Sequence, residues 1–255
     1  MKNIVKGLVS VFFRVAGQIK PHYTCIVCDQ KIPRFFKISS YFEREWKKYG
    51  FAYDYDDFET LNAAHYSCPI CFSNDRDRLI ILYLKRMSDT TKSLLEVAPS
   101  YALKRYFKKN PNYVSCDLKR TDVDIQCDIT NMSVIKNESF DIVICSHVLE
   151  HVENDREALE ELFRVLKPQG TCLILVPILK KNYEENIPKS NILLSDSERW
   201  KFFGQRDHLR NYSQKSLITL INKTCFGIEL FMPREEECIK FGIKEKSVLY
   251  VLKKV

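Results

Sequence analysis

The chain has 255 residues, of which 45% are hydrophobic, which suits a folded globular protein and excludes a disordered one. Its net charge is +7, but lysine and arginine are scattered along the chain, which favours solubility over nucleic-acid binding. Ten cysteines would fit a secreted disulfide scaffold, yet Cys116, Cys145 and Cys172 lie in predicted buried strands, where free cysteine acts as a small apolar residue. We therefore expect a protein of the reducing cytoplasm.

Residues 1–20 combine a short apolar patch with flanking basic residues, Lys2, Lys6, Arg14 and Lys20. The patch is too short to span a bilayer, and Arg14 interrupts it, which argues against a signal peptide. We expect an amphipathic helix. Two placements stay open: peripheral contact with the inner face of a membrane, or docking on the protein itself.

Residues 21–75 contain two C-x-x-C turns, Cys25 to Cys28 and Cys68 to Cys71. Four thiolates from two such turns suit tetrahedral zinc, and a closed site of this kind leaves no position for water, so the zinc would be structural. The alternative is a set of thiols without metal.

The segment between the two turns is rich in aromatic residues, which we expect to build a small core around the metal. They are Tyr41, Phe42, Trp46, Tyr49, Phe51, Tyr53, Tyr55 and Phe58. Aromatic residues interspersed with lysine and arginine also suit single-stranded nucleic acid, but acidic residues in the same stretch argue against that interpretation.

Residues 76–92 connect this domain to the rest of the chain. Arg76 to Met87 has the apolar spacing of a helix that packs against a sheet. Arg76 and Arg78, at its start, are candidates for contacting a substrate or a carboxylate partner, or are exposed side chains.

Three predicted strands follow, residues 93–97, 112–118 and 123–129, and each carries an acidic residue near its end: Glu96, Asp117 and Asp128. Ligands of open α/β sheets bind at the carboxyl ends of the strands, and an acidic residue after the second strand is placed to accept ribose hydroxyls. Any one of them alone would also serve as a helix cap. The three in order favour a nucleoside cofactor.

Residues 140–177 predict a strand, a helix and a second strand. Asp141 to Ser146 and Thr171 to Val176 are apolar runs of strand length, and Asn154 is a suitable N-cap for the amphipathic helix between them. Two buried strands joined by a helix form a right-handed βαβ unit, which implies a parallel sheet.

The run D-I-V-I-C-S-H-V-L-E-H-V, followed by L-F-R-V-L-K-P-Q-G, resembles the later motifs of class I S-adenosylmethionine (SAM) dependent methyltransferases of the type 11 kind. Gln169 stands where that family usually has glycine. The run C-P-I-C-F-S-N-D-R-D-R-L resembles a module that precedes the catalytic domain in some bacterial members. The resemblance implies a Rossmann-like seven-stranded methyltransferase sheet over residues 93–255, with a small N-terminal zinc-knuckle domain.

The resemblance also implies a set of cofactor-binding residues. They are Glu96, Ala98, Pro99, Asp117, Leu118, Asp128, Ile129, Ser146 and His147. Asp128 would accept from the adenine amine and Ile129 would cover one face of the ring. The turn after the first strand reads E-V-A-P-S instead of the usual glycine-rich sequence, and resembles a variant of the zinc-knuckle subgroup.

The run from His147 to His151 also matches the pattern H-x-x-E-H, an inverted zinc-protease motif. That motif needs both histidines on one helix face, whereas here it follows a strand in a nucleotide-binding pattern. We therefore reject a protease and expect Glu150 and His151 to stabilise the turn.

Residues 179–212 form a long connection, which is typical of a lid or binding loop. Its end, F-G-Q-R-D-H-L-R-N-Y, resembles an acceptor-side stretch of the same subgroup. His208 is the expected catalytic base, with Asp207 orienting it and Arg206 or Arg210 holding an anionic acceptor. The alternative is a structural cluster that packs the lid.

These observations predict methyl transfer from SAM to an oxygen or nitrogen of a small molecule or glycan precursor. An RNA methyltransferase that grips its substrate with the knuckle is less favoured, so a nucleic-acid partner is not our first expectation. The glycine-poor turn keeps a third class open, a SAM-binding or adaptor protein without catalysis.

Overall fold

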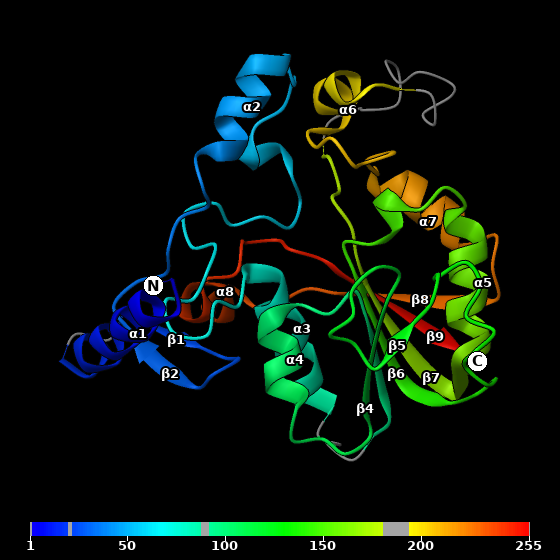
Figure 1. The fold of residues 1–255 in the computed structure, drawn as a ribbon, viewed down its shortest axis with the longest axis horizontal. Coiled ribbons are helices and arrows are strands. Elements are labelled where there is room, and N and C mark those ends of the chain that lie inside the picture. The colour runs from blue at the N-terminus through cyan, green and yellow to red at the C-terminus, as the bar shows by residue number, and fades with distance from the viewer. Residues whose placement is uncertain (1, 20–21, 88–91, 181–193, 255) are drawn as a thin grey trace.

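The computed structural model describes residues 2–19, 22–87, 92–180 and 194–254. Its main sheet has seven strands in the order β5-β4-β3-β6-β7-β9-β8 (Figure 1). The strands are β3 (Leu94–Val97), β4 (Tyr113–Asp117), β5 (Ile125–Gln126), β6 (Phe140–Ser146), β7 (Leu166–Leu175), β8 (Phe226–Phe231) and β9 (Leu249–Lys254). The pairs from β5 to β7 are parallel, and β9 runs antiparallel to both of its neighbours. The expected seven-stranded Rossmann-like sheet is confirmed.

The strand order reverses at the centre of this sheet. The chain moves outward from β3 through β4 to β5 and then returns to place β6 on the other side of β3. This is the topological switch point where the carboxyl ends of parallel strands leave a ligand crevice. The turns after β3, β4 and β6 therefore border one site.

Helices cover both faces of the sheet. On one face lie α3 (Asp75–Met87) and α4 (Tyr101–Phe107), and on the other α5 (Asp155–Val165) and α7 (Gln214–Ile221) (Figure 1). Helix α5 begins as predicted, with the Asn154 side chain accepting from the backbone N–H of Glu157. Its apolar stripe, including Leu159 and Leu162, is fully buried against the sheet.

Two expected elements differ in the structure. The third strand is only Ile125–Gln126, because the chain turns at Asp128, whose backbone forms an isolated bridge with Asn131. From the sequence, residues 227–232 and 247–252 are expected to be two strands of an antiparallel hairpin. Strands β8 and β9 do pair antiparallel, but the expected hairpin connection is wrong. Helix α8 (Glu235–Phe241) lies between them, since three glutamates in its first turn favour a helix N-terminus.

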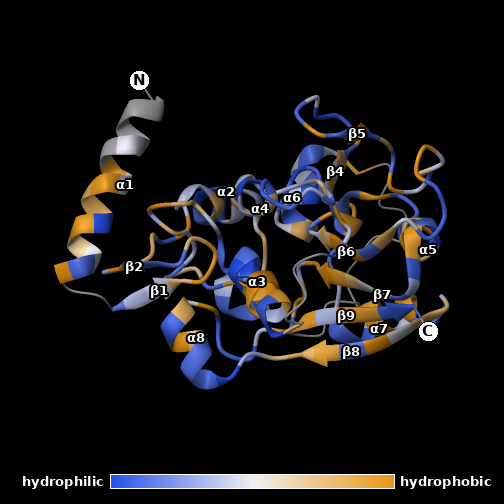
Figure 2. Cartoon of the chain, turned by 90° about the horizontal axis from the view of Figure 1, so that it is seen from below, coloured by the Kyte–Doolittle hydropathy of each residue, from blue (hydrophilic) through white to orange (hydrophobic). Residues whose placement is uncertain are grey.

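The N-terminal helix α1 (Lys2–Ile19) docks on a small hairpin of β1 (Tyr23–Cys25) and β2 (Gln30–Ile32). Gly17 permits the close approach, because a Cβ there would lie 2.0 Å from the carbonyl oxygen of Lys31. Phe13 is buried against the ring of Phe36. The outward side stays exposed and partly apolar (Figure 2), at Val11, Phe12, Val15 and Ile19.

Among the described residues, no helix has the length and apolar character needed to cross a bilayer.

The aromatic segment does not surround the four cysteines, so that expectation is wrong. Helix α2 (Tyr41–Tyr49) and the short helix η1 (Tyr55–Asp57) pack instead against α6 (Asp196–Phe203). Their aromatic cluster comprises Trp46, Phe51, Phe58, Leu179, Trp200 and Phe203. Trp46 Nε1 donates to the carbonyl oxygen of Gly204 at 2.8 Å. The cysteines are packed by apolar residues of β1, β2 and α3.

Polar contacts hold the aromatic segment above the sheet. Lys244 Nζ donates to the carbonyl oxygens of Tyr55 at 3.2 Å and Phe58 at 2.7 Å. The hydroxyl of Tyr250, on β9, donates to the Glu59 carboxylate at 3.0 Å. The segment is therefore fixed to the sheet from the carboxyl-terminal side of the chain.

Arg78, on α3, is fully buried and joins three parts of the chain. Its guanidinium donates to the carbonyl oxygens of His65, Tyr66 and Ser73 near the second cysteine turn, and to that of Gly242 at the end of α8. It also lies over the ring of Phe35, 4.0 Å from the ring centroid. The expectation that Arg78 contacts a substrate is wrong, since every described contact is internal.

Replacing Arg78 by alanine should lower the free energy of unfolding by at least about 3 kcal/mol, because each buried carbonyl left without a donor costs about 1 kcal/mol or more. Chemical denaturation of metal-loaded protein measures this. Arg105→Ala, at an exposed site on α4, is the matched control and should change stability by less than about 0.5 kcal/mol. Equal stability of the two variants would contradict the account.

Candidate functional site

The four predicted cysteines come together in one cluster. Cys25 Sγ lies 3.6 Å from Cys71 Sγ, and Cys28 Sγ lies 3.9 Å from Cys68 Sγ. A tetrahedral zinc ion with Zn–S bonds of about 2.3 Å places its sulfurs about 3.8 Å apart. Three of the four side chains are buried, and the Ser73 hydroxyl lies 3.2 Å from both Cys25 Sγ and Cys71 Sγ. The cluster fits a closed structural zinc site.

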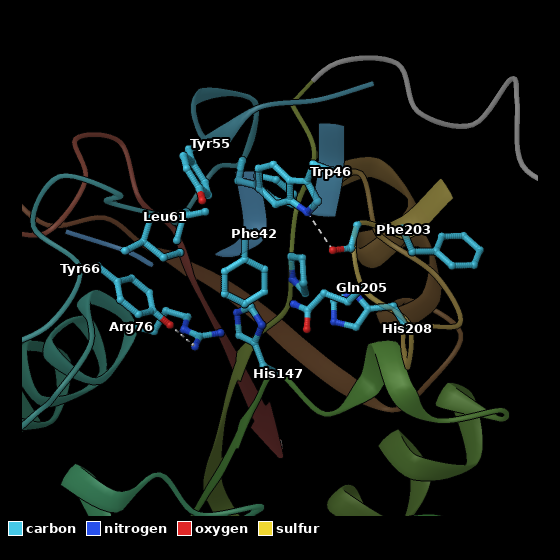
Figure 3. Close-up of a pocket in the computed structure, with 14 residues that line it drawn as sticks. Phe42, Trp46, Tyr55, Leu61, Tyr66, Arg76, His147, Phe203, Gln205 and His208 are labelled. Carbon is cyan, nitrogen blue, oxygen red and sulfur yellow. Dashed lines mark hydrogen bonds between the residues drawn. The ribbon is translucent and has the colours of Figure 1, made fainter. Parts of the chain in front are cut away.

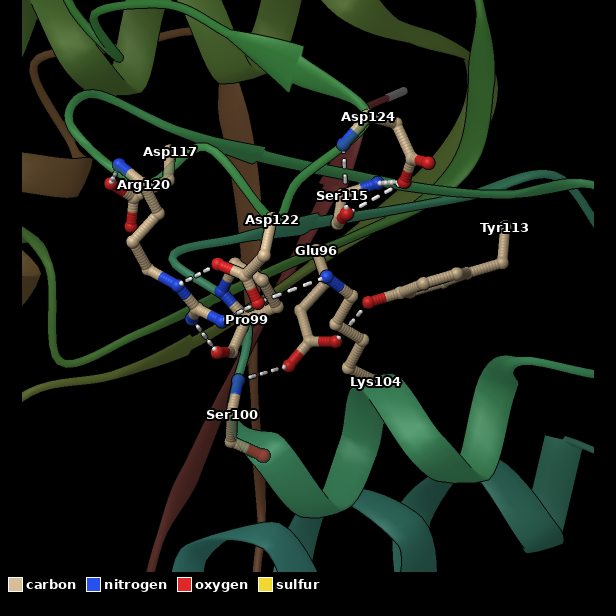
Figure 4. A network of polar contacts seen from close by, with 10 residues as sticks. All are labelled: Glu96, Pro99, Ser100, Lys104, Tyr113, Ser115, Asp117, Arg120, Asp122 and Asp124. Carbon is tan, nitrogen blue, oxygen red and sulfur yellow. Dashed lines mark hydrogen bonds and ion pairs between the residues drawn. The ribbon is translucent and has the colours of Figure 1, made fainter.

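Glu96, at the end of β3, organises the turn that would face the cofactor (Figure 4). One carboxylate oxygen accepts from the backbone N–H of Ser100 at 2.9 Å, and the other accepts from the hydroxyl of Tyr113 at 2.7 Å. Burial raises the pKa of Glu96 to about 7, against the lowering effect of these two bonds. Both oxygens are used internally, so Glu96 shapes the turn.

The turn from Ala98 to Ser100 keeps a left-handed conformation without glycine. Ala98 has a φ of 50°, a region that glycine enters more readily than alanine. Arg120 reaches from the turn after β4 and donates to the carbonyl oxygen of Pro99 at 2.5 Å (Figure 4). Ser100 caps α4 by accepting from the backbone N–H of Leu103. Internal contacts thus hold this turn where a glycine-rich loop is usual.

The remaining predicted cofactor residues lie at or just after the carboxyl ends of β4 and β5 and have different roles. Asp117 Oδ1 accepts from the backbone N–H groups of Lys119 and Arg120, and Oδ2 takes no part in these bonds. Leu118 is exposed, and Asp128 Oδ1 accepts from Thr130. Ile129 is buried in the core beneath the sheet edge. Asp117 Oδ2 and the exposed face of Leu118 are therefore the groups best placed to meet a nucleoside.

Beside the carboxyl end of β6, the structure forms a pocket that is partly open to solvent. Its walls are aromatic and come from the segment before α3 and from the end of α6 (Figure 3). The main ones are Phe42, Trp46, Tyr55, Phe58, Tyr66 and Phe203. Apolar walls with a few convergent polar groups are typical of a small-molecule site.

The polar groups of the pocket are Arg76, His147, Gln205 and His208. His147 follows β6 with a φ of 58°, a sparsely populated conformation that is often found at functional sites. Figure 3 shows Arg76, His147 and His208 grouped around Phe42. The pocket therefore offers one cation and two imidazoles on an aromatic background.

Burial controls the charge of the two imidazoles. Desolvation lowers the pKa of His147 to about 4 and that of His208 to about 4. Both are neutral near pH 7 and offer a nitrogen lone pair. His147 Nδ1 lies 3.0 Å from Oε1 of the fully buried Glu150. Burial acts to raise the pKa of Glu150, and any positive charge on the neighbouring histidines acts to lower it.

The structure corrects the roles expected near His208. Asp207 lies beside His151 instead, with its carbonyl oxygen 3.0 Å and its carboxylate 3.7 Å from Nδ1 of that histidine. Arg210 donates to the carbonyl oxygens of Val152 and Glu153 and so holds the turn. Arg206 is exposed and outside the pocket lining. The arginine that lines the pocket is instead Arg76, at the start of α3.

Sequence reasoning missed the aromatic walls and placed His147 only on the cofactor side. A signal was present, because eight aromatic residues between positions 41 and 58 exceed what a metal knuckle needs. The aromatic residues pack against the segment around Gly204, which is far away in the sequence. The pocket between the two segments could therefore not be predicted from the sequence.

Replacing Glu96 by glutamine should make stability less dependent on pH. The native state binds the Glu96 proton more tightly than the unfolded chain, so this group's contribution is full below about pH 4.5 and is lost as pH rises to about 7. As pH rises from 5 to 8, the free energy of unfolding of Glu96→Gln should increase, relative to that of wild type, by on the order of 3 kcal/mol. Denaturation at several pH values tests this, with the exposed Glu229→Gln as control; a difference that does not change with pH would refute it.

A scan of family models matches residues 83–174 to the methyltransferase domain of type 11. Curated relatives match over parts of their length. A probable polyketide synthase (9/36) of Dictyostelium discoideum is 33% identical over 107 residues, which are 41% of this chain and 3% of that protein. The C-methyltransferase UbiE of ubiquinone and menaquinone biosynthesis from Hydrogenovibrio crunogenus is 34% identical over 87 residues, 29% of this chain and 34% of that one.

A ubiquinone biosynthesis O-methyltransferase of Rickettsia bellii is 25% identical over 142 residues, 55% of this chain and 51% of that one. The chain thus spans about half or less of the length of these relatives. A putative methyltransferase of known structure from Bacillus halodurans is 17% identical, covers 68% of this chain and 97% of its own, and has a TM-score of 0.44. Over residues 83–174, the chain is therefore similar to methyltransferase domains.

Proposed function

We propose that this protein is an active methyltransferase whose acceptor is a small, flat molecule that carries a hydroxyl and an anionic group. The observation that carries the proposal is the aromatic pocket with Arg76, His147 and His208 beside the cofactor crevice. Aromatic walls suit a planar apolar body, and a buried guanidinium suits a carboxylate or phosphate.

The cofactor side of the proposal uses groups already placed. Asp117 Oδ2 is free to accept ribose hydroxyls, and Glu96 fixes the turn whose backbone would approach the amino-acid end of the cofactor. When bound, SAM supplies an electrophilic methyl group on its sulfonium. Internal hydrogen bonds hold the turn from Ala98 to Ser100 in its conformation although it lacks glycine. A turn that is held in this way favours catalysis over a purely adaptor role.

On the acceptor side, the chain binds, orients and deprotonates. Arg76 would hold the anionic end of the acceptor, and Phe42 and Trp46 would confine its ring. The neutral imidazoles of His147 and His208 are the groups able to take a hydroxyl proton, because both line the pocket and hold a lone pair near pH 7. Positioning of the two reactants would supply most of the acceleration.

Replacing His208 by alanine should lower kcat by about 10²- to 10⁴-fold and leave SAM affinity unchanged, because His208 lines the acceptor pocket and not the cofactor crevice. Transfer of labelled methyl from SAM to 4-hydroxybenzoate, 3,4-dihydroxybenzoate and a hydroxyaryl phosphate measures turnover, and calorimetry measures SAM binding.

His22→Ala, at an exposed site, is the control and should retain full turnover. Loss of SAM binding together with turnover in the His208 variant would remove the acceptor-side assignment. Absence of transfer to any of the three acceptors by SAM-binding wild type would contradict the proposed acceptor class.

We also propose that the four-cysteine cluster binds zinc and that this zinc holds the knuckle together. The sulfur spacing supports it, as does the shared apolar core that joins the cysteine turns to α3 and one face of the sheet. Loss of the ion would therefore loosen the start of α3, where Arg76 and Arg78 lie.

Replacing Cys68 by serine should lower the zinc content by one equivalent per chain and reduce the melting temperature, because a structural zinc site contributes directly to folding. Elemental analysis and thermal denaturation measure the two effects. Cys225→Ser, at an exposed cysteine, should change neither. Wild-type protein that contains no zinc after purification without chelator would refute this proposal.

A further inference from the structure

A second cluster of potential metal ligands lies beneath the acceptor pocket. Glu150, His151 and His208 each offer a ligand atom, and the three atoms lie within 4.8 Å of one another. Glu150 and His151 belong to the short helix η2 (Leu149–His151) after β6, and His208 comes from the loop after α6. A backbone bond from the N–H of Leu209 to the carbonyl oxygen of Glu150, at 2.8 Å, fixes the two segments together.

The carboxylate of Glu150 is unusually isolated for a buried charge. The residue is fully buried, and neither carboxylate oxygen has a hydrogen-bond donor among the described residues. The contact of Oε1 with His147 Nδ1, at 3.0 Å, lacks hydrogen-bond alignment. Arg76 acts on Glu150 only through its charge. A buried ionised carboxylate without donors is costly unless a cation compensates it.

His151 is oriented as metal-bound histidines usually are. Its Nδ1 lies 3.0 Å from the carbonyl oxygen of Asp207. A carbonyl oxygen only accepts, so Nδ1 carries the hydrogen and Nε2 keeps its lone pair. Donation of the second ring nitrogen to a backbone carbonyl is the common way in which a protein fixes a ligating imidazole.

His208 completes the set. It is almost fully buried, and its Nδ1 has no hydrogen-bond partner among the described residues. Its ring lies edge-on to that of His151, with 4.7 Å between the centroids. Two imidazole nitrogens and one carboxylate oxygen thus lie within 4.8 Å of one another, and neither the Glu150 carboxylate nor His208 Nδ1 has a hydrogen-bond partner among the described residues.

We propose that Glu150, His151 and His208 bind one divalent transition-metal ion at the floor of the acceptor pocket. Imidazole and carboxylate donors together suit iron(II), cobalt(II), manganese(II) or zinc, and two histidines with one carboxylate leave coordination positions open. His208 also lines the pocket, so the open positions lie next to the acceptor.

The ion also gives the pocket a second means of acceptor recognition. An acceptor oxygen that enters an open position would bind the ion and lose its proton more readily. The proton would pass to His147, which also lines the pocket, because the ion occupies the lone pair of His208. This part rests on the proposed function; binding of the ion itself does not. It differs from the rejected protease in that His147 is outside the ligand set.

Cobalt(II) titration of protein whose cysteine cluster is filled with zinc tests the site. We expect one equivalent to bind, with visible ligand-field bands and no thiolate charge-transfer band, since the donors are nitrogen and oxygen. Glu150→Gln, His208→Ala and His151→Gln should each weaken binding at least tenfold. His22→Ala, at an exposed site, should keep wild-type affinity.

His151→Gln guards against a folding artefact, because this side chain is partly exposed and its loss should leave the melting temperature nearly unchanged. No cobalt beyond the cysteine cluster in wild type, or equal affinity in wild type and His151→Gln, would overturn the proposal. If cobalt does not bind but His208→Ala still loses turnover, the metal site fails alone. If cobalt binds but no acceptor is methylated, the proposed function fails alone.

Discussion

The buried guanidinium of Arg78 is the contact on which the arrangement of the whole chain depends. It donates hydrogen bonds to carbonyl oxygens of the second cysteine turn and of the end of α8. The amino-terminal knuckle, helix α3 and the carboxyl-terminal segment therefore all contact this one side chain. A buried cation is costly unless acceptors compensate it, and here backbone carbonyl oxygens accept from both Nη1 and Nη2 of Arg78. Because Arg76 is two residues earlier on the same helix, this anchoring also fixes the cation of the acceptor pocket.

The sheet provides one half of the site and the aromatic segment the other. The carboxyl ends of β3, β4 and β6 supply Glu96, Asp117 and His147, as the strand order requires. Trp46 and its neighbours close the pocket from above, held by Lys244 and by the bond to Gly204. The amino-terminal domain therefore shapes the pocket, and under the proposed function acceptor selection would depend on residues outside the segment 83–174 that matches the methyltransferase domain. This explains why relatives that share only the sheet give little information on the acceptor.

The parts of the fold that were predictable from the sequence are those with local or periodic signals. Strand β6, the capped helix α5 and the four cysteines follow from apolar runs, from Asn154 and from the C-x-x-C spacing. The pocket was not predictable, because its walls depend on contacts such as Trp46 to Gly204, which are 158 residues apart. Helix α8 was not predicted, because its only sequence signal is the run of three glutamates in its first turn. Glu150 and His151 were visible as a turn motif, but nothing in their spacing places His208 beside them.

The most direct test of the central claim, that the glycine-poor turn builds a working cofactor site, is calorimetric titration of SAM and its demethylated product into zinc-loaded protein, with Asp117→Ala for comparison. The account predicts binding in the micromolar range by wild type and binding at least tenfold weaker by the variant, because a ribose hydroxyl would lose its acceptor. Absence of binding by folded, zinc-loaded wild type would contradict the account and favour a non-catalytic adaptor.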